Sequence, residues 1–207
     1  MSTPDFLFDG DPGDLTVILA HGAGAPMDSP FMNTMARGLA EKGLRVARFE
    51  FPYMRHKREG RGSRPPDREP VLLQTWRDAV EALGGGERVV VGGKSMGGRM
   101  ASLVADELGV RGLVCLGYPF HPPGKPESLR VKHLEPLRTP ALIVQGTRDA
   151  LGSREDVEGY TLSPAIRLVW LEDGDHSFKP RVSSGHSEKG HLAAAVEAVA
   201  GFVKERT

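Results

Sequence analysis

The sequence predicts a three-layer αβα sandwich, with a mostly parallel sheet between two layers of helices, in one domain over residues 1–207. Short, continuously apolar segments alternate along the chain with segments whose apolar residues recur at helical spacing. Strands that are apolar throughout are typical of a sheet covered on both faces. Glycine-rich turns follow several of them, and a chain of 207 residues has the size of one such domain.

The first half of the chain supplies three strand–helix pairs. The expected strands are residues 15–20, 45–51 and 88–91. The expected helices are residues 30–42, residues 71–83, and a helix after the turn 92–98 that carries Met100, Leu103, Val104 and Leu108. Ser29-Pro30 offers an N-cap and a proline at the first helical position, and the triple glycine at 84–86 ends the second helix. Between the second strand and that helix, residues 55–68 read as a polar loop.

The second half continues the alternation with shorter helices. The expected strands are residues 112–116, 141–145 and 167–171, and the expected helices are a brief stretch at 128–137, a short one at 154–160 and a last one at 187–204. The proline-rich segment 119–140 is too short for a large lid. In parallel sheets of this kind the ligand crevice lies at the carboxyl ends of the strands, so we expect the functional residues in the turns that follow them.

Composition limits the partners. Lys plus Arg and Asp plus Glu balance at 27 each, so no net field draws the chain to nucleic acid or to a membrane surface. The single Cys115 cannot form an internal disulfide, and the opening residues lack the layout of a secretory signal, so we expect a cytoplasmic protein. No apolar run approaches the ~20 residues of a membrane span. The composition leaves a homo-oligomer open.

The segment from Gly93 to Gly97 reads Gly-Lys-Ser-Met-Gly and matches G-x-S-x-G between an expected strand and an expected helix. Glycines on either side allow the sharp turn that lifts a serine hydroxyl above the sheet. We therefore predict Ser95 as a nucleophile. The alternative is a serine that only caps the following helix.

A serine hydroxyl needs a base, and the base needs an acid that orients it. Asp149 and His176 follow two later strands, in the order serine, acid, histidine that this arrangement uses. They are our predicted acid and base. The weaker rivals are His186 and His191 for the base, and Asp173 and Asp175 for the acid.

The oxyanion formed on attack needs two N–H donors. We predict the backbone amide of Met96 and, from the loop after the first strand, that of Ala23, with Gly24 as an alternative that also borders the substrate. Aromatic residues that follow strand ends are candidates for an acyl pocket, although ordinary packing explains them equally well. They are Phe51, Tyr53, Tyr118 and Phe120.

Other site chemistries fit less well. Asp173, Asp175 and His176 lie within one short turn with no second ligand set, so we predict no metal and no cofactor. A phosphate-binding P-loop ending at Ser95 would need glycine where Arg88 stands. A dinucleotide fingerprint after the first strand has Met27 in place of its third glycine. Cys115, inside an apolar strand, is expected to be a buried and inert thiol.

The loop 55–68 carries a local excess of positive charge. It reads as a solvated surface loop, or as a site for an anionic substrate or an acidic protein. The second reading gives an alternative function, a non-catalytic interaction module. The basic residues are Arg55, Lys57, Arg58, Arg61, Arg64 and Arg68.

Four motifs resemble the α/β-hydrolase superfamily, namely His-Gly-Ala-Gly-Ala, Gly-Gly-Lys-Ser-Met-Gly-Gly-Arg, Gly-Thr-Arg-Asp and Gly-Asp-His-Ser-Phe. They look like its small, lidless branch near the dienelactone hydrolases, and like bacterial relatives of the testis-expressed and NSL-complex-subunit proteins. The resemblance implies a minimal hydrolase fold without a large cap, with an eight-stranded core shortened at the N-terminus. It also implies a carboxylesterase-like serine hydrolase acting on a small acyl substrate. Ser95 stands where dienelactone hydrolases have cysteine, so their particular lactone is not implied.

Overall fold

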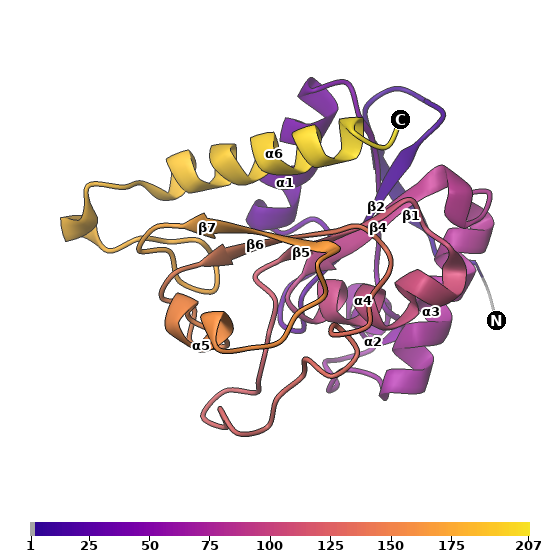
Figure 1. The fold of residues 1–207 in the computed structure, drawn as a ribbon. Helices are drawn as coiled ribbons and strands as arrows, with labels where there is room; N and C mark the ends of the chain where they lie inside the picture. Colours follow the sequence, from indigo (N-terminus) through magenta and orange to yellow (C-terminus); the bar gives the residue numbers. More distant parts are fainter. Residues whose placement is uncertain (1–2) are drawn as a thin grey trace.

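The computed structural model describes residues 3–207; Met1 and Ser2, part of the opening segment discussed above, lie outside them. A seven-stranded sheet runs through the centre in the order β1-β3-β2-β4-β5-β6-β7 (Figure 1). All neighbouring strands are parallel except β1, which pairs antiparallel with β3. The strands are β1 (Phe6–Asp9), β2 (Thr16–Ala20), β3 (Arg45–Phe49), β4 (Val89–Lys94), β5 (Gly112–Leu116), β6 (Ala141–Gly146) and β7 (Ile166–Leu171).

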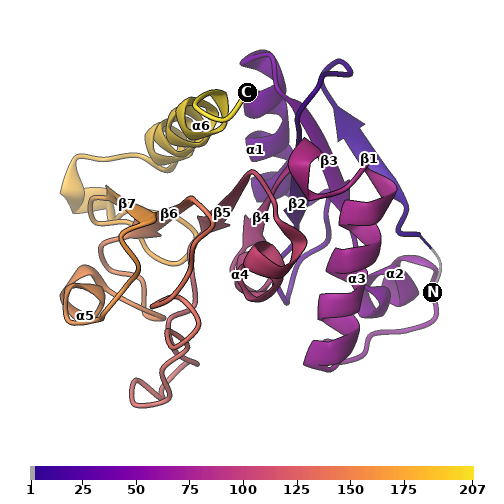
Figure 2. The ribbon, with the colours of Figure 1, turned by 45° about the vertical axis from the view of Figure 1, so that its right-hand side comes forward.

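Helices cover both faces of the sheet. On one face lie α1 (Pro30–Glu41) and α6 (Glu188–Lys204), and on the other lie α2 (Pro52–Arg58), α3 (Glu69–Ala82), α4 (Met96–Leu108) and α5 (Arg154–Glu158), as Figures 1 and 2 show. Two short 3₁₀ turns, Gly86–Arg88 and Val182–Ser184, complete the elements. The predicted three-layer sandwich with a mostly parallel sheet and no large cap is confirmed for residues 3–207.

Each face of the sheet has its own hydrophobic core. Along β2, Ile18 and Ala20 pack toward α3 and α4, whereas Val17 and Leu19 pack toward α1 and α6. All four are fully buried. Side chains on both faces of such a strand pack against helices, which is why the strands read as largely apolar runs. No helix within residues 3–207 combines the length and apolar character needed to cross a bilayer.

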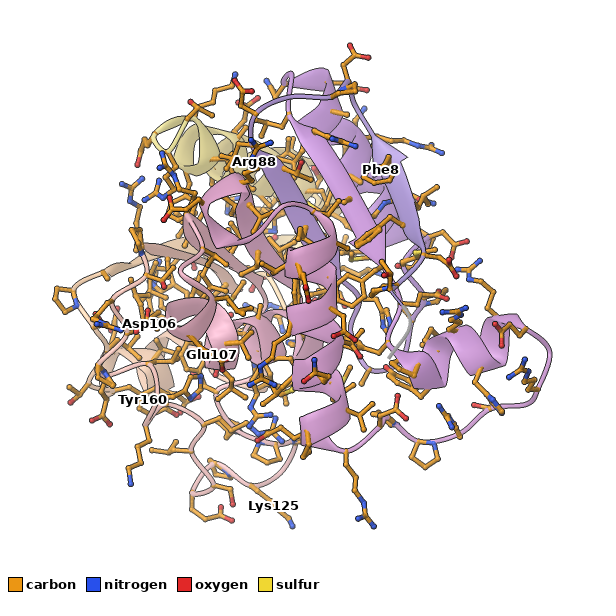
Figure 3. All side chains as sticks on the ribbon, turned by 90° about the vertical axis from the view of Figure 1, so that its right-hand side faces the viewer. Phe8, Arg88, Asp106, Glu107, Lys125 and Tyr160 are labelled. Atoms are coloured by element: carbon orange, nitrogen blue, oxygen red, sulfur yellow. The ribbon has the colours of Figure 1, made fainter. Side chains whose placement is uncertain are left out.

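Three local predictions were wrong. The strand β1 was not predicted, because it is short and lies at the edge of the sheet, where Phe8 stays 45% exposed (Figure 3). The first part of the expected loop 55–68 belongs to α2, which begins at Pro52 because proline favours the first helical position. The stretch 128–137 contains a turn at 132–136 and no helix, since Pro136 has no N–H to continue a helical ladder.

The parallel strands bring four loops to one edge of the sheet. These loops follow β2, β4, β6 and β7, and they begin with His21, Ser95, Thr147 and Glu172. Because parallel strands all end at the same edge, residues more than 80 positions apart in the chain meet there. This edge holds the candidate site.

Candidate active site

Ser95 sits at the sharp turn between β4 and α4, with φ 50° and ψ −115°. A non-glycine residue rarely adopts a positive φ, and such strain concentrates at functional sites. The flanking glycines make the turn possible: a Cβ at Gly93 would lie 2.2 Å from the carbonyl oxygen of Ala20, and one at Gly97 would lie 2.5 Å from it. The motif therefore reflects the close approach of β2 to the turn.

Ser95, His176 and Asp149 form one chain of hydrogen bonds. His176 Nδ1 lies 2.7 Å from Asp149 Oδ2, and His176 Nε2 lies 2.8 Å from Ser95 Oγ. An ionised carboxylate only accepts, so Nδ1 carries the proton and Nε2 accepts from the serine hydroxyl. This tautomer is the one a general base needs.

Asp149 is fully buried and its orientation is fixed by three donors. Its Oδ1 accepts from the N–H of Leu151 at 2.8 Å, and its Oδ2 accepts from Gln145 Nε2 at 2.9 Å as well as from His176. Gln145, at the end of β6, is fully buried and also accepts from the N–H of Tyr118 at 2.7 Å. The sequence analysis missed Gln145, although a single glutamine in the apolar run 141–145 signals a buried polar group that needs partners.

The loop after β6, which carries Asp149, and the loop after β7, which carries His176, are tied to each other. Thr147 Oγ1 accepts from the N–H of Asp173 at 2.7 Å, and the N–H of Arg148 donates to the carbonyl of Gly174 at 2.9 Å. The Arg148 guanidinium pairs with the Asp173 carboxylate at 2.9 Å. These contacts fix the position of Asp149 relative to His176.

The rival acids are used elsewhere. Asp173 accepts from the N–H of Arg181 and pairs with its guanidinium, and these contacts hold the pKa of that carboxyl low, at about 2. Asp175 Oδ1 accepts from the N–H groups of Ser177 and Lys179. Both carboxylates therefore stabilise the loop that carries His176 rather than orient the His176 imidazole.

The rival histidines lie outside this hydrogen-bond chain. His191 is buried, and its Nδ1 donates to the carbonyl of Phe178 at 2.8 Å. His186 is exposed, with its ring 5.3 Å from that of His191. Of the three candidate histidines, His176 is the one that contacts Ser95.

The loop after β2 is held from both sides. His21 Nε2 accepts from the N–H of Phe51 at 3.2 Å, which leaves the proton on Nδ1 to donate to the carbonyl of Gly22 at 2.7 Å. Burial lowers the pKa of His21 and favours this neutral form. The Tyr53 hydroxyl donates to the carbonyl of Ala23 at 2.9 Å. These contacts fix the peptide units on either side of the Ala23 Cα. The other expected donor is the N–H of Met96, the first residue of α4, and it has no partner within the helix.

Lys94 lies inside the elbow, which is the Gly93–Gly97 turn, and is a further residue that the sequence analysis did not assign. Its ammonium donates to the carbonyl of His176 and lies 5.4 Å from the ring centroid of Phe31 and 5.7 Å from that of Phe178. Burial lowers the pKa of Lys94 to about 8. Lys94 thus connects the turn at Ser95 to the loop that carries His176.

A cavity of about 550 Å³ opens over Ser95. Its walls include Ala23 and Gly24 from the loop after β2, Phe31 from α1 and Leu192 from α6, together with His176. The aromatic candidates lie elsewhere. Phe51, Tyr118 and Phe120 are fully buried in the core on the α2–α4 face, and Tyr53 supports the loop after β2, so ordinary packing accounts for these side chains.

A family model described as an alpha/beta hydrolase domain matches residues 13–204 of the chain. The chain belongs to the α/β-hydrolase family. The match covers the elbow and the loops that carry Asp149 and His176, in agreement with the resemblance seen in the sequence. The relation to testis-expressed proteins stays a prediction.

Solved structures resemble this α/β hydrolase over nearly its whole length. A serine hydrolase without a lid from Xanthomonas campestris is 21% identical, with a TM-score of 0.72 over 97% of this chain and 88% of that one. A dienelactone hydrolase from Anabaena variabilis is 21% identical, with a TM-score of 0.69 over 97% and 91%. Est1E from Butyrivibrio proteoclasticus, solved with ferulic acid, is 18% identical, with a TM-score of 0.72 over 98% and 94%. At these identities the likeness shows a shared fold.

The basic residues of the α/β hydrolase between 55 and 68 are mostly paired within the chain. Arg55 lies near Asp5 and Glu59, and Arg58 pairs with both Asp28 and Glu50. Arg61 pairs with Glu59, and Arg64 with Asp67. Pairing lowers the local excess of positive charge, which favours a structural role for these arginines over capture of an acidic partner.

The remaining site predictions concern a metal and a thiol. Within residues 3–207 no three His, Cys, Asp or Glu side chains gather as metal ligands. Cys115 is fully buried in β5, and burial raises the pKa of its thiol. A thiol that resists ionisation is a poor nucleophile, as its apolar surroundings predicted.

Proposed function

We propose that this α/β hydrolase is a serine hydrolase that cleaves an ester or a related acyl bond of a small molecule through an acyl-enzyme on Ser95. The observation that carries the proposal is the continuous hydrogen-bond chain from the Ser95 hydroxyl through His176 to the buried Asp149. This geometry supports the proposal, because a serine nucleophile needs a base in this tautomer and an acid that orients the base.

The proposed reaction has two balanced steps. Ser95 Oγ attacks the acyl carbon while His176 Nε2 takes the hydroxyl proton, and the amides of Met96 and Ala23 stabilise the oxyanion. The imidazolium returns the proton to the leaving group as the acyl–oxygen bond breaks. Water then attacks the acyl-enzyme with His176 again as base, and the acid product leaves as Ser95 regains its proton. Asp149 stays ionised throughout.

Labelling with a fluorophosphonate tests the nucleophile, because this reagent reacts with an activated serine and not with an ordinary one. We expect the wild type to be labelled and Ser95→Ala to be unlabelled. On a panel of short acyl esters, Ser95→Ala should lose about 10⁴–10⁶ in kcat. Ser102→Ala is a matched control, since this helix serine lies outside the hydrogen-bond chain and bonds instead to Arg99 and His133. Comparable turnover by Ser95→Ala would exclude the proposal.

A further inference from the structure

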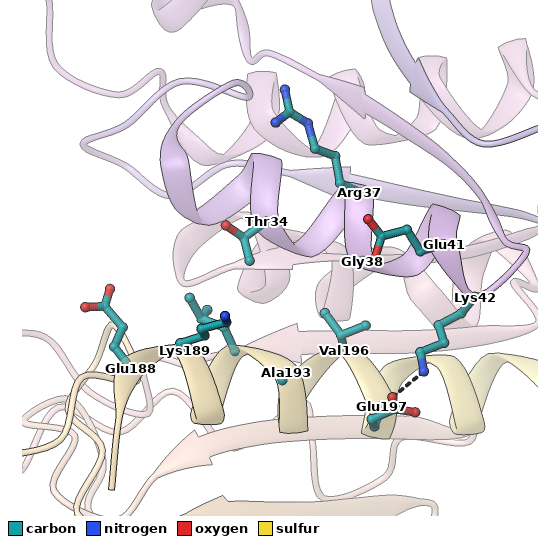
Figure 4. A pocket seen from close by; sticks show the side chains of 11 residues that line it. Thr34, Arg37, Gly38, Glu41, Lys42, Glu188, Lys189, Ala193, Val196 and Glu197 are labelled. Atoms are coloured by element: carbon teal, nitrogen blue, oxygen red, sulfur yellow. Dashed lines mark ion pairs between the residues drawn. The ribbon is translucent and has the colours of Figure 1, made fainter.

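A groove between α1 and α6 extends away from the candidate site. Its volume is about 750 Å³, and it shares Thr34, Glu188 and Leu192 with the cavity over Ser95 (Figure 4). Lys42 and Glu197 border the groove but not the cavity, and their ion pair lies at the far end. The groove therefore begins at the site and runs outward between the two helices.

Small residues let the two helices approach closely and give the groove an apolar floor. A Cβ at Gly38 of α1 would lie 2.8 Å from the side chain of Val196 in α6, so this side chain packs directly against the backbone of α1 there. Leu192 and Ala193 continue the apolar lining toward the site. The charged residues on the groove are three cations and three anions, Arg37, Lys42, Lys189, Glu41, Glu188 and Glu197. Balanced charges give no preference for an ionic ligand, whereas the floor favours an aliphatic one.

We propose that this groove binds the acyl chain of the substrate and that the enzyme prefers esters of unbranched aliphatic acids of medium length. The inference rests on the proposed function, because it assigns the chain of the acyl group that Ser95 would carry. The groove spans Glu188 to Glu197 along α6, which is about 14 Å at a rise of about 1.5 Å per residue. An extended chain of roughly ten methylenes has this length, at about 1.25 Å per methylene for bonds of about 1.5 Å.

Chain length should therefore set the rate. An open groove removes about half of each methylene from water, so kcat/KM should rise about twofold per methylene, half of the free-energy gain of a buried methylene. Between butanoate and decanoate, six methylenes give a rise of roughly sixtyfold. Uniform binding of this kind appears in kcat/KM and not in the chemistry at Ser95.

The test compares p-nitrophenyl esters from acetate to decanoate on three proteins. Ala193→Trp fills the groove from an exposed position of α6, and Ala194→Trp places the same side chain at an exposed position of the same helix that does not line the groove. We expect Ala193→Trp to lower kcat/KM for decanoate at least tenfold and to leave acetate and butanoate within twofold. Ala194→Trp should retain the wild-type profile.

Each outcome separates this inference from the proposed function. Ser95-dependent hydrolysis without a rise toward decanoate, or matching profiles for Ala193→Trp and Ala194→Trp, would overturn the groove assignment and leave the nucleophile intact. An oligomer in gel filtration that only Ala193→Trp dissociates, with an unchanged chain-length profile, would overturn it in favour of a second copy of the chain in the groove. Hydrolysis that Ser95→Ala leaves unchanged would instead refute the proposed function.

Discussion

Replacing Gln145 by glutamate tests whether this residue acts as a donor to Asp149. Gln145 Nε2 lies 2.9 Å from Asp149 Oδ2 and 3.0 Å from the carbonyl oxygen of Gly152, and both partners only accept. The substitution Gln145→Glu keeps the shape of the side chain but puts a carboxyl oxygen at this position. The new group can donate there only while it holds a proton, and ionisation would place two buried negative charges in contact.

The loss of stability in Gln145→Glu follows from the difference in the pKa of the new carboxyl between the folded and the unfolded state. In the unfolded chain the introduced carboxyl has a pKa of about 4.3, and in the folded protein its pKa is raised well above that value by the Asp149 carboxylate. The folded state then binds one more proton than the unfolded state, so the free energy of unfolding falls as pH rises, by about 1.4 kcal/mol per unit. At pH 7 the variant should be about 3.7 kcal/mol less stable than at low pH through this effect.

Urea unfolding at pH 5 and pH 7 gives the free energy of unfolding of the variant and of the wild type, and the difference between the two measures the effect. Between these values the difference should grow by about 2.7 kcal/mol. Gln74→Glu is the matched control, because Gln74 Nε2 donates to Asp78 Oδ1 at 2.8 Å, but both side chains lie at partly exposed positions of α3, where water reaches a carboxylate. Its difference should change by less than about 0.5 kcal/mol. An equal difference for Gln145→Glu at both pH values would refute the assignment of Gln145 as a buried donor.

Three further changes test other parts of the site. Asp149→Asn should lower kcat in the ester assay by about 10⁴, because an amide favours the tautomer of His176 that cannot accept from Ser95. As the control, Asp175→Asn should keep kcat within tenfold of the wild type. Gly97→Ala should lower the free energy of unfolding in urea by about 1–3 kcal/mol, since its Cβ would lie 2.5 Å from the Ala20 carbonyl oxygen. Gly201→Ala is the control, because a Cβ there meets open space and should not destabilise the protein. Burial lowers the pKa of Lys94 to about 8, so above that pH the unfolded state binds more protons than the folded state. The free energy of unfolding of the wild type, measured relative to Lys94→Met, should therefore rise between pH 8 and pH 10. If the difference between the two proteins stayed constant over this range, the pKa of the amine would not be lowered.

The sequence predicted those parts of the site that local geometry determines. The elbow was recognisable because the approach of β2 leaves no room for side chains at Gly93 and Gly97. Asp149 and His176 followed from chain order, since parallel strands end at one edge. The hydrogen bond between them and the one from Ser95 to His176 agree with these assignments, whereas their catalytic roles remain proposals.

Contacts between distant segments were beyond such reasoning. Phe51, Tyr118 and Phe120 follow strand ends, as active-site residues do, but whether a side chain after a strand turns into the core or into the crevice depends on which helix packs over it. Their burial on the α2–α4 face, away from the cavity on the α1–α6 side, is a result of tertiary packing. Gln145 carried a signal in its polarity, but its partners became visible only with the loop 149–152 in place.

Backbone strain and substrate choice are located in different parts of this fold. Within residues 3–207 the non-glycine residues with positive φ are Ser95, Asp173 and Phe178, all in the loops that carry Ser95 and His176. Contacts of Thr147 and Arg148 join the loop of Asp149 to the loop of His176 and hold this strained arrangement. A substitution at either residue should therefore change the rate for every substrate alike. The groove between α1 and α6 contacts the site at one end only, and substitutions along it should change the dependence on chain length and leave short esters unaffected. If a substitution deep in the groove slowed all chain lengths equally, the two regions would be coupled through the sheet and this division would fail.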